Sequence, residues 1–199
     1  MFNNNQTIQF GKKVGQPMNL RQIFYNVFNY AGSAIGWWSC VLGAAAGNPW
    51  LGPTVISVYL SLHFVWSKQK QHDAIFILLA GLIGLGVETI KKNTGLVVYH
   101  ADIPGGLVPP IWMMALWLMF ASTLTASLGW LRGRYFLSFV LGAVFGPLSY
   151  LAGEGLGAIA LPHPPFQTIL TFAIIWALVT PTLAWMADQL LPKQERILS

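Results

Sequence analysis

The sequence predicts an all-α protein: a polytopic membrane helix bundle with six transmembrane helices and both termini in the cytoplasm. Two observations carry this prediction, the composition and six apolar blocks of spanning length. Of 199 residues, 55% are hydrophobic and only 9% are charged, whereas about 25% are charged in soluble domains. The mean hydropathy of +0.57 and the nine tryptophans also indicate lipid as the main solvent.

The six apolar blocks follow one another between two polar tails, 1–20 and 191–199. Crossing the hydrocarbon layer takes about 17–25 residues of helix, and each block reaches or approaches that length. The blocks are 23–46, 51–66, 74–90, 110–129, 135–160 and 167–187. We therefore expect one transmembrane domain, 21–190, that contains all six helices.

The connections between the blocks have the composition of turns and loops. "GNPW" suits a tight hairpin between the first two blocks, and "SKQKQHD" is a charged loop before the third. "KKNTGLVVYHADIPGG" is a longer link, "WLRGR" is short and basic, and "LPHPPF" contains three prolines. Pro53 falls in the first turn of the second block, where a helix tolerates proline, and Pro181 predicts a kink in the sixth.

Basic residues are distributed unequally between the two sides of this predicted bundle. Nine lie on the side that holds both termini: Lys12, Lys13, Arg21, Lys68, Lys70, Arg132, Arg134, Lys193 and Arg196. The other side has only Lys91 and Lys92. Because Lys and Arg are enriched in cytoplasmic loops, we expect both termini in the cytoplasm.

Several kinds of chemistry have no signature in this sequence. The net charge of +5 comes without a nucleic-acid-binding motif, so we exclude a nucleic-acid partner. Cys40, the single cysteine, cannot form an internal disulfide and is interpreted as a packing residue. Ser149 does not lie in a nucleophile elbow, and no glycine-rich phosphate loop occurs. We therefore expect no catalytic residue, no metal and no cofactor.

One face of the fifth block is rich in small residues. The residues Gly146, Pro147, Tyr150, Gly153, Glu154 and Gly157 follow i, i+3, i+4 spacing, so they share one side of a helix. Small residues allow helix backbones to approach closely in lipid. We expect this face, Glu154 included, to point into the bundle in the outer half of the membrane.

Ionisable residues within the blocks are candidates for function, because charge is costly in lipid. Glu88 lies near the outer end of the third block, with Lys91 and Lys92 on the same helical face. These three residues form either an ion pair that anchors the helix end or a polar binding site. Glu154 and Tyr150 of the fifth block could meet them there. The five predicted substrate-binding residues are therefore Glu154, Glu88, Tyr150, Lys91 and Lys92.

Other polar residues within the blocks have structural interpretations. His63, about one turn from the inner end of the second block, is expected near the membrane interface. Ser122, Thr123, Thr125 and Ser127 lie in the fourth block. We expect their hydroxyls to bond the carbonyl one turn back or a neighbouring helix.

Three stretches carry a resemblance to a known family: "GWWSCVLGAAAGNPWLGP" (36–53), "PIWMMALWLMFASTLTASLGWLRGR" (110–134) and "LGAVFGPLSYLAGEGLGA" (141–158). They resemble a family of small bacterial inner-membrane proteins identified only as a domain of unknown function. The resemblance implies one polytopic domain in the bacterial inner membrane, and it supplies no catalytic residues. Members of the family typically have an aspartate where this chain has Glu88, so a carboxylate is kept on a longer side chain.

Three functional interpretations remain open. In the first, the protein handles a lipid or small molecule without catalysis, as a transporter or accessory subunit. Its partners are then the bilayer, such a ligand and an unidentified membrane protein. In the second, which the family's association with lipid-modifying enzymes motivates, it is an enzyme of lipid modification that uses Glu88 or Glu154. In the third it is a scaffold. A lateral opening between helices with Glu154 at its base favours lipid handling, a water-filled vestibule favours solute transport, and a tight, dry bundle favours the scaffold.

Overall fold

The computed structural model describes residues 20–102 and 106–191, which form six α-helices, one short 3-10 helix (Gly129–Leu131) and one short strand pair. The helices are α1 (Leu20–Ala45), α2 (Leu51–Trp66), α3 (Lys70–Asn93), α4 (Ile111–Thr125), α5 (Tyr135–Gly155) and α6 (Pro165–Leu190). Each helix starts and ends within about five residues of a predicted apolar block, so the all-α class is confirmed. Apart from Leu20 and Leu191, the predicted tails 1–20 and 191–199 lie outside the described residues.

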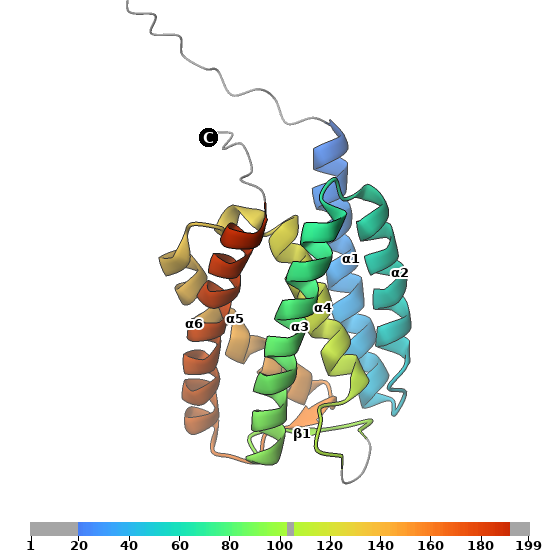
Figure 1. The fold of residues 1–199 in the computed structure, drawn as a ribbon. Coiled ribbons are helices and arrows are strands. Elements are labelled where there is room, and N and C mark those ends of the chain that lie inside the picture. Colours follow the sequence, from blue (N-terminus) through green and yellow to red (C-terminus); the bar gives the residue numbers. More distant parts are fainter. Residues whose placement is uncertain (1–19, 103–105, 192–199) are drawn as a thin grey trace, which may run out of the picture.

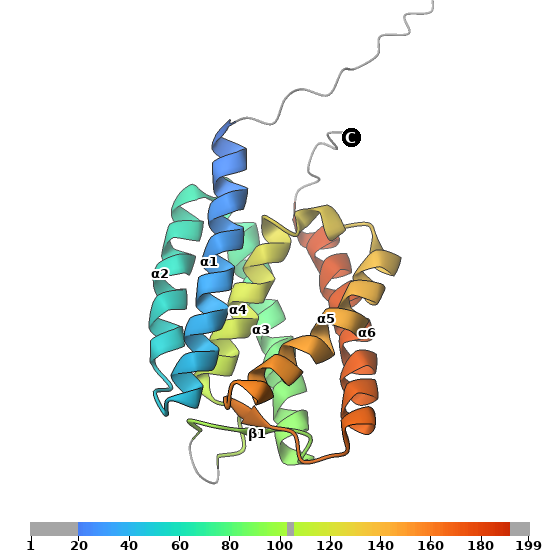
Figure 2. The same ribbon diagram turned by 180° about the vertical axis from the view of Figure 1, so that it is seen from behind.

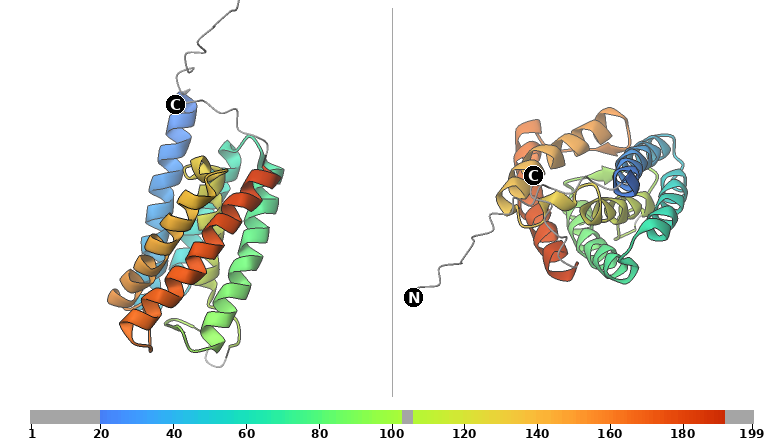
Figure 3. Two further views of the ribbon diagram at one scale, coloured as in Figure 1. Left: turned by 90° about the vertical axis from the view of Figure 1, so that its left-hand side faces the viewer. Right: turned by 90° about the horizontal axis from the view of Figure 1, so that it is seen from above.

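Successive helices run in opposite directions, and α1 begins at the same end of the bundle at which α6 ends (Figure 1). α1 packs against α2, α5 packs against α6, and α4 packs against α1, α2 and α3. Seen along the bundle axis, α5 and α6 lie on one side and α1 to α4 on the other (Figure 3). α5 crosses the bundle obliquely (Figure 2). Its first turns accompany α6, and the chain just after its last turn reaches the end of α1, where Gly157 lies beside Ala45.

A short antiparallel strand pair connects two of the interhelical links, and the sequence analysis did not predict it. β1 (Val98–Tyr99) pairs with β2 (Ile159–Ala160), and Tyr99 lies opposite Ile159. The pair ties the link between α3 and α4 to the link between α5 and α6. It therefore holds Tyr99 beside the end of α3, where the candidate site lies.

The fifth apolar block ends as a helix at Gly155, five residues before its predicted end at 160. A Schellman turn closes the helix: Gly157 N–H donates to the Glu154 carbonyl at 2.9 Å, and Ala158 N–H donates to the Gly153 carbonyl at 2.9 Å. This turn needs a positive φ, and Gly157 has a φ of 81°. The chain then reverses into β2.

Within residues 20–102 and 106–191, three helices, α3, α5 and α6, are long and apolar enough to cross a membrane. α2 and α4 are also apolar, with 16 and 15 residues. Large hydrophobic side chains cover the outer surface: Phe136 is 81% exposed and Phe24 is 71% exposed. Water-soluble monomers rarely expose extended apolar surface, so this exterior is suited to contact with lipid.

The buried face predicted for α5 is present except at Glu154 and at Gly157, which lies beyond the last helical residue, Gly155. Gly146, Pro147, Tyr150 and Gly153 are buried, whereas Glu154 is exposed. The prediction that Glu154 faces the interior of the bundle is therefore wrong. The other four residues form the contact surface of α5, as expected.

Candidate functional site

The Glu88 carboxylate is the centre of a buried polar cluster. Glu88, on α3, is 0% exposed. Its Oε1 atom accepts hydrogen bonds from Lys91 Nζ at 2.5 Å, from Tyr150 Oη at 2.6 Å and from Trp117 Nε1 at 3.0 Å. Its Oε2 atom accepts a hydrogen bond from Tyr99 Oη. We call these five residues the Glu88 cluster; α3, α4, α5 and β1 all contribute to it.

Lys91 supplies the charge that balances Glu88. It is 1% exposed and pairs with Glu88 across one turn of α3. Its Nζ atom also donates to Tyr150 Oη. The same atom lies 4.1 Å from the centroid of the Tyr150 ring and 5.2 Å from that of Phe172. Because a desolvated cation is stabilised by aromatic faces and by an opposite charge, the pair forms a neutral unit inside the bundle.

Tyr99 donates to this cluster from outside the helices. Burial and, after it, the Glu88 carboxylate raise the pKa of Tyr99 well above its usual value. The phenol therefore stays protonated at neutral pH and remains a hydrogen-bond donor. Its ring packs edge-on against Trp112, with centroids 6.0 Å apart, and Trp112 Nε1 donates to the His100 carbonyl at 3.1 Å. The strand pair and Trp112 thus hold Tyr99 in place.

Of the five predicted site residues, the structure brings Glu88, Lys91 and Tyr150 together. Lys92 lies apart, with its Nζ atom 2.5 Å from Asp102 Oδ2 in the α3–α4 link. Successive residues on a helix point about 100° apart. For that reason Lys91 faces the bundle, and Lys92 faces the link.

Glu154 also lies apart from the Glu88 cluster. Its exposed carboxylate accepts a hydrogen bond from the Leu161 N–H at 2.9 Å. Glu154 belongs to the last turn of α5, where Tyr150 and Gly153 take the inward positions. The chain reverses just after this turn, which brings Leu161 within reach of the Glu154 side chain. Glu154 therefore stabilises the returning segment and does not form part of a buried site.

Two members of the cluster, Trp117 and Tyr99, were missed by the sequence analysis. Trp117 belongs to a block that is apolar on all sides, so no periodicity distinguishes it. Tyr99 lies in a segment that we interpreted as a plain link. One signal was present, because buried carboxylates need donors and Trp and Tyr side chains each carry one. That signal alone could not select two residues among so many aromatics.

A second polar cluster lies near the other end of α3. His63, on α2, is fully buried: its Nδ1 atom is 3.1 Å from Tyr25 Oη, and its Nε2 atom is 3.5 Å from Asp73 Oδ2. Ser67 Oγ donates to the same Asp73 oxygen at 2.6 Å. Thr125 Oγ1 of α4 lies 3.5 Å from His63 Nε2. His63 is covered by residues of α1 and α4, and it lies one turn before the end of α2, so its expected position near the membrane interface stays a prediction.

The hydroxyls of the fourth block behave as expected. Ser122, Thr123 and Thr125 each donate to the carbonyl three residues back, at 2.6, 2.6 and 2.9 Å. Ser127 Oγ donates to Asn29 Oδ1 of α1 at 2.6 Å. These hydroxyls thus satisfy the backbone of α4 and join it to α1.

A partly open cavity of about 670 Å³ adjoins the Glu88 cluster. Residues of α1, α4, α5 and α6 form most of its lining. Trp117 and Tyr150 belong both to the cavity lining and to the Glu88 cluster. The described lining residues are aliphatic, aromatic, small or hydroxyl-bearing, and none of them is charged. The cavity therefore suits an apolar molecule.

Comparisons with known proteins identify a family and no individual relative. No curated protein and no solved structure matches the chain. One family model, described as "Protein of unknown function (DUF2878)", matches residues 26–182. The match covers the whole Glu88 cluster and most of the helical bundle. The chain therefore belongs to the DUF2878 family, as its resemblance to an uncharacterised family predicted.

Proposed function

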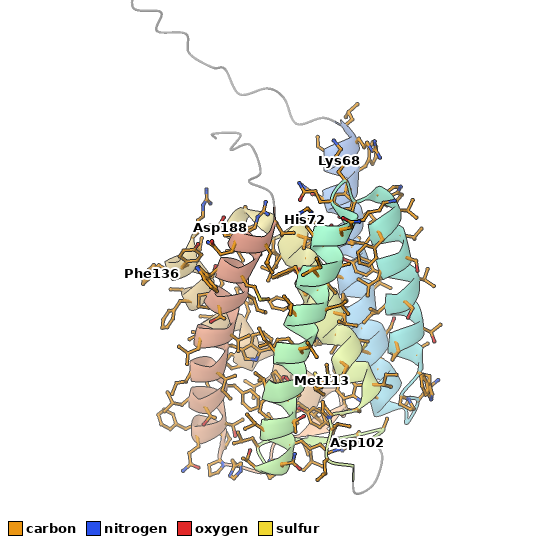
Figure 4. All side chains as sticks on the ribbon, in the orientation of Figure 1. Lys68, His72, Asp102, Met113, Phe136 and Asp188 are labelled. Carbon is orange, nitrogen blue, oxygen red and sulfur yellow. The ribbon has the colours of Figure 1, made fainter. Side chains whose placement is uncertain are left out.

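We propose that this protein is an integral protein of the bacterial inner membrane that crosses the bilayer six times, with both termini in the cytoplasm. The three described helices that are long and apolar enough to cross a membrane, together with the apolar exterior, support a membrane location. α1, α2 and α4 pack beside one another in the same bundle, which supports six crossings. Lys68 and His72 lie at the end where α1 begins, and Asp102 lies at the opposite end (Figure 4). Basic residues favour the cytoplasmic side.

Within the membrane we assign the protein a non-enzymatic role: it binds a lipid or another apolar small molecule in the cavity, as a transporter or accessory subunit. The cavity is the observation that carries this assignment. Its volume of about 670 Å³ lies within the range of roughly 300–1,000 Å³ found for small-molecule sites. Tyr30 of α1 and Phe145 of α5 line the cavity and are exposed, and in this proposal a hydrocarbon chain enters from the bilayer beside them.

The Glu88 cluster has a positioning role in this proposal. Tyr150 and Trp117 contact the ligand, and their polar atoms are fixed by the Glu88 carboxylate behind them. Lys91 balances the charge of Glu88. Because the ring faces of Tyr and Trp are apolar, a ligand meets an apolar wall whose orientation is set by buried polar contacts.

The geometry disfavours the two other interpretations. An acid or base must reach the proton that it transfers, but Glu88 lies behind Tyr150 and Trp117 and is occupied by their donors. Glu154 is not among the described residues that line the cavity. A scaffold of tightly packed helices has no reason to keep a cavity of this size, since interiors usually have few voids larger than a water molecule.

A tryptophan at Ala34 tests this function. Ala34 is on α1, lines the cavity and is exposed, so the larger side chain has room to enter the cavity. Ala31, one turn earlier and also exposed, is not among the described lining residues and gives the matched control. We expect lipids or other apolar molecules to co-purify with the native protein and with Ala31→Trp, and to be largely lost from Ala34→Trp. Native mass spectrometry and extraction of the purified proteins measure this difference.

Equal retention by folded Ala34→Trp and Ala31→Trp would contradict the cavity as the binding site. The melting temperatures of the two variants in the same detergent check that both are folded. A native protein that carries no apolar molecule, and takes up none when it is added, would overturn the function itself.

A further inference from the structure

Two polar atoms in the cavity lining lack a hydrogen-bond partner. Among the side chains that the structure describes, Trp176 Nε1 and Thr180 Oγ1 are buried without one. Both residues lie on α6, one turn apart, and both line the cavity. Thr180 is only 4% exposed. Since buried polar groups are nearly always bonded, unpaired atoms beside a cavity indicate a ligand group that completes them.

The Trp176 ring is held in position before any ligand binds. It stacks on Trp117 with centroids 5.4 Å apart, and Phe120 meets it edge-on at 5.6 Å. On its other side it packs against Gly146, where an added β-carbon would lie 2.2 Å from Trp176 Cγ. The direction of the indole N–H is therefore set by packing. Because a fixed donor loses little conformational entropy on binding, it increases the affinity for a ligand that carries an acceptor in the right place.

Most other hydroxyls of the lining have already donated their protons. Ser127 donates to Asn29 Oδ1, Thr123 and Ser149 donate to backbone carbonyls, and Tyr150 donates to Glu88. Toward a ligand, these groups offer only lone pairs. Trp176 and Thr180 differ from them, because each still has a proton to give. The α6 side of the cavity therefore favours a hydrogen-bond acceptor.

The charge of that acceptor follows from the rest of the lining. None of the described residues around the cavity is charged, so an anionic group there would have no counter-charge. Burying an unpaired charge in an apolar space is far more costly than burying a neutral oxygen. A carbonyl oxygen has two lone pairs and can accept from two donors at once. The acceptor is then a neutral oxygen.

The position of the two donors along α6 indicates where in the ligand's hydrocarbon chain this oxygen lies. Trp176 lies eleven positions after Pro165, the first residue of α6, or about 17 Å along the helix axis. Gly146, against which it packs, is near the middle of the α5 segment that lines the cavity. Lining residues continue toward both ends of the bundle from this level. Hydrocarbon can therefore extend in both directions from the acceptor.

We infer that the cavity selects an uncharged lipid with a carbonyl oxygen within its hydrocarbon chain, which accepts hydrogen bonds from Trp176 Nε1 and Thr180 Oγ1. This inference rests on the proposed function and names its ligand class. It distinguishes such a lipid from a plain hydrocarbon chain and from a fatty acid anion.

Radiolabelled heptadecan-9-one and heptadecane, equal in chain length, provide the test. Cavity binding is the difference in uptake between the native protein and Ala34→Trp at a fixed detergent concentration. We expect the ketone to bind about tenfold more tightly than the alkane, the effect of two modest hydrogen bonds. In the double variant Trp176→Phe, Thr180→Val, which removes both donors from the cavity lining, the ratio of ketone affinity to alkane affinity falls to about one. Palmitate is expected to bind more weakly than the ketone.

Stability gives a second readout for the same two residues. In delipidated protein, Thr180→Val replaces an unpaired hydroxyl by a methyl group of similar shape, so its melting temperature should be equal to or above that of the native protein. A clear decrease would show that Thr180 has a protein partner and would overturn the inference.

The binding outcomes separate the two proposals. The carbonyl inference is overturned if ketone and alkane bind equally, or if the preference for the ketone survives in the double variant. In either case, alkane uptake that Ala34→Trp blocks still supports the cavity as a binding site. Tighter binding of palmitate overturns the uncharged class. No cavity-dependent uptake of any probe overturns both proposals.

Discussion

At the scale of single residues, Glu88 and Lys91 depend on one another. Both side chains are almost fully buried, and Lys91 Nζ lies 2.5 Å from Glu88 Oε1. A buried ion pair adds little net stability compared with apolar residues of the same shape, but removing one partner leaves an unpaired charge inside the protein. The position of Lys91 three residues after Glu88 makes the pair possible on one helix face.

A double-mutant cycle tests this dependence. We expect Glu88→Gln and Lys91→Met each to lower the free energy of unfolding by about 3–5 kcal/mol, since each leaves one buried charge alone. The combination Glu88→Gln, Lys91→Met should lose clearly less than the sum of the two, because no unpaired charge remains. Denaturant unfolding in mixed micelles measures all three variants against the native protein.

Lys92→Met is the control for this cycle. Lys92 pairs with Asp102 nearer the surface, where an ion pair contributes about 0–1 kcal/mol. Its loss should therefore have little effect on stability. If the effects of Glu88→Gln and Lys91→Met simply add, the two residues are not coupled, and the Glu88 cluster does not act as a unit.

Single residues were only partly predictable from the sequence. The pairing of Glu88 with Lys91 followed from helical spacing, and the inward position of Tyr150 followed from the small-residue face of its helix. Glu154 lies at the edge of this face in the last turn of α5, and because successive residues point about 100° apart, its spacing alone did not decide whether it would be buried. Which indole would meet Glu88 depended on how α4 rotates against α3, and no local pattern fixes that rotation.

At the scale of helices, the contact between α5 and α6 depends on the absence of side chains at two positions of α5. At Gly142, an added β-carbon would lie 2.3 Å from the Trp176 carbonyl oxygen and 2.5 Å from Thr180 Oγ1. Gly146 is crowded in the same way by the Trp176 ring. Gly153, which shares this face, is different: its nearest neighbour would be Ile159 Cδ1 at 3.6 Å, an ordinary contact.

Alanine substitutions at these glycines should therefore differ in effect. We expect Gly142→Ala to lower the free energy of unfolding by about 1–3 kcal/mol, because a backbone oxygen cannot move aside cheaply. Gly153→Ala in the same helix should be close to neutral. Gly86→Ala in α3, where nothing lies within 4 Å, should stabilise the protein by up to about 1 kcal/mol through helix propensity. Thermal unfolding of the three variants in one detergent provides the measurement.

Similar melting temperatures for Gly142→Ala and Gly86→Ala would contradict the close approach of α5 to α6. The comparison is matched, because both glycines lie in helix interiors and both changes add a single methyl group. A difference between them therefore reports the packing and not the intrinsic preference for helix.

The extents of the helices were largely predictable, and the strand pair was not. Long apolar blocks and Gly or Pro connections mark the helices directly. The segment after Gly155 is as apolar as the helix before it, so hydropathy alone continued the fifth block to 160. Gly157 was the available stop signal, since a glycine in this position commonly ends a helix. A strand of two residues has no periodicity, and its partner lies some 60 residues away in the sequence.

At the scale of the whole molecule, two of the buried polar clusters form separate layers. The Glu88 cluster lies toward one end of the bundle, and the cluster of His63 and Asp73 lies toward the other. The cavity extends between α1 and α5 and contacts the first layer through Tyr150 and Trp117. In lipid, apolar association between helices is weak, so buried polar contacts and close glycine packing contribute much of the specificity. Both polar layers join helices that are distant in the sequence.

The orientation of the bundle in the membrane is open to direct measurement. The ends at which α1 begins and α6 ends lie together (Figure 1), and the loops after α2 and before α5 lie at the same end. These loops contain Lys68, Arg132 and Arg134, and Lys70 is the first residue of α3. Since cytoplasmic loops are enriched in basic residues, we expect reporter fusions after Lys70 and after Arg134 to be active as cytoplasmic reporters.

Fusions near Asn48, His100 and His163, in the loops at the other end, should be active only as external reporters. The His163 fusion is the most informative, because α5 and α6 flank it and are both span-capable by themselves. A cytoplasmic signal at His163 together with one at Arg134 would mean that α5 does not cross the bilayer, and six crossings would be wrong. A cytoplasmic signal at Asn48 alone would mean instead that α1 and α2 do not cross the bilayer. Among the described residues, α1 does not meet the criteria of length and apolarity for a span, and α2 is apolar but short. The positions of the three signals thus identify which helix pair departs from the proposed topology.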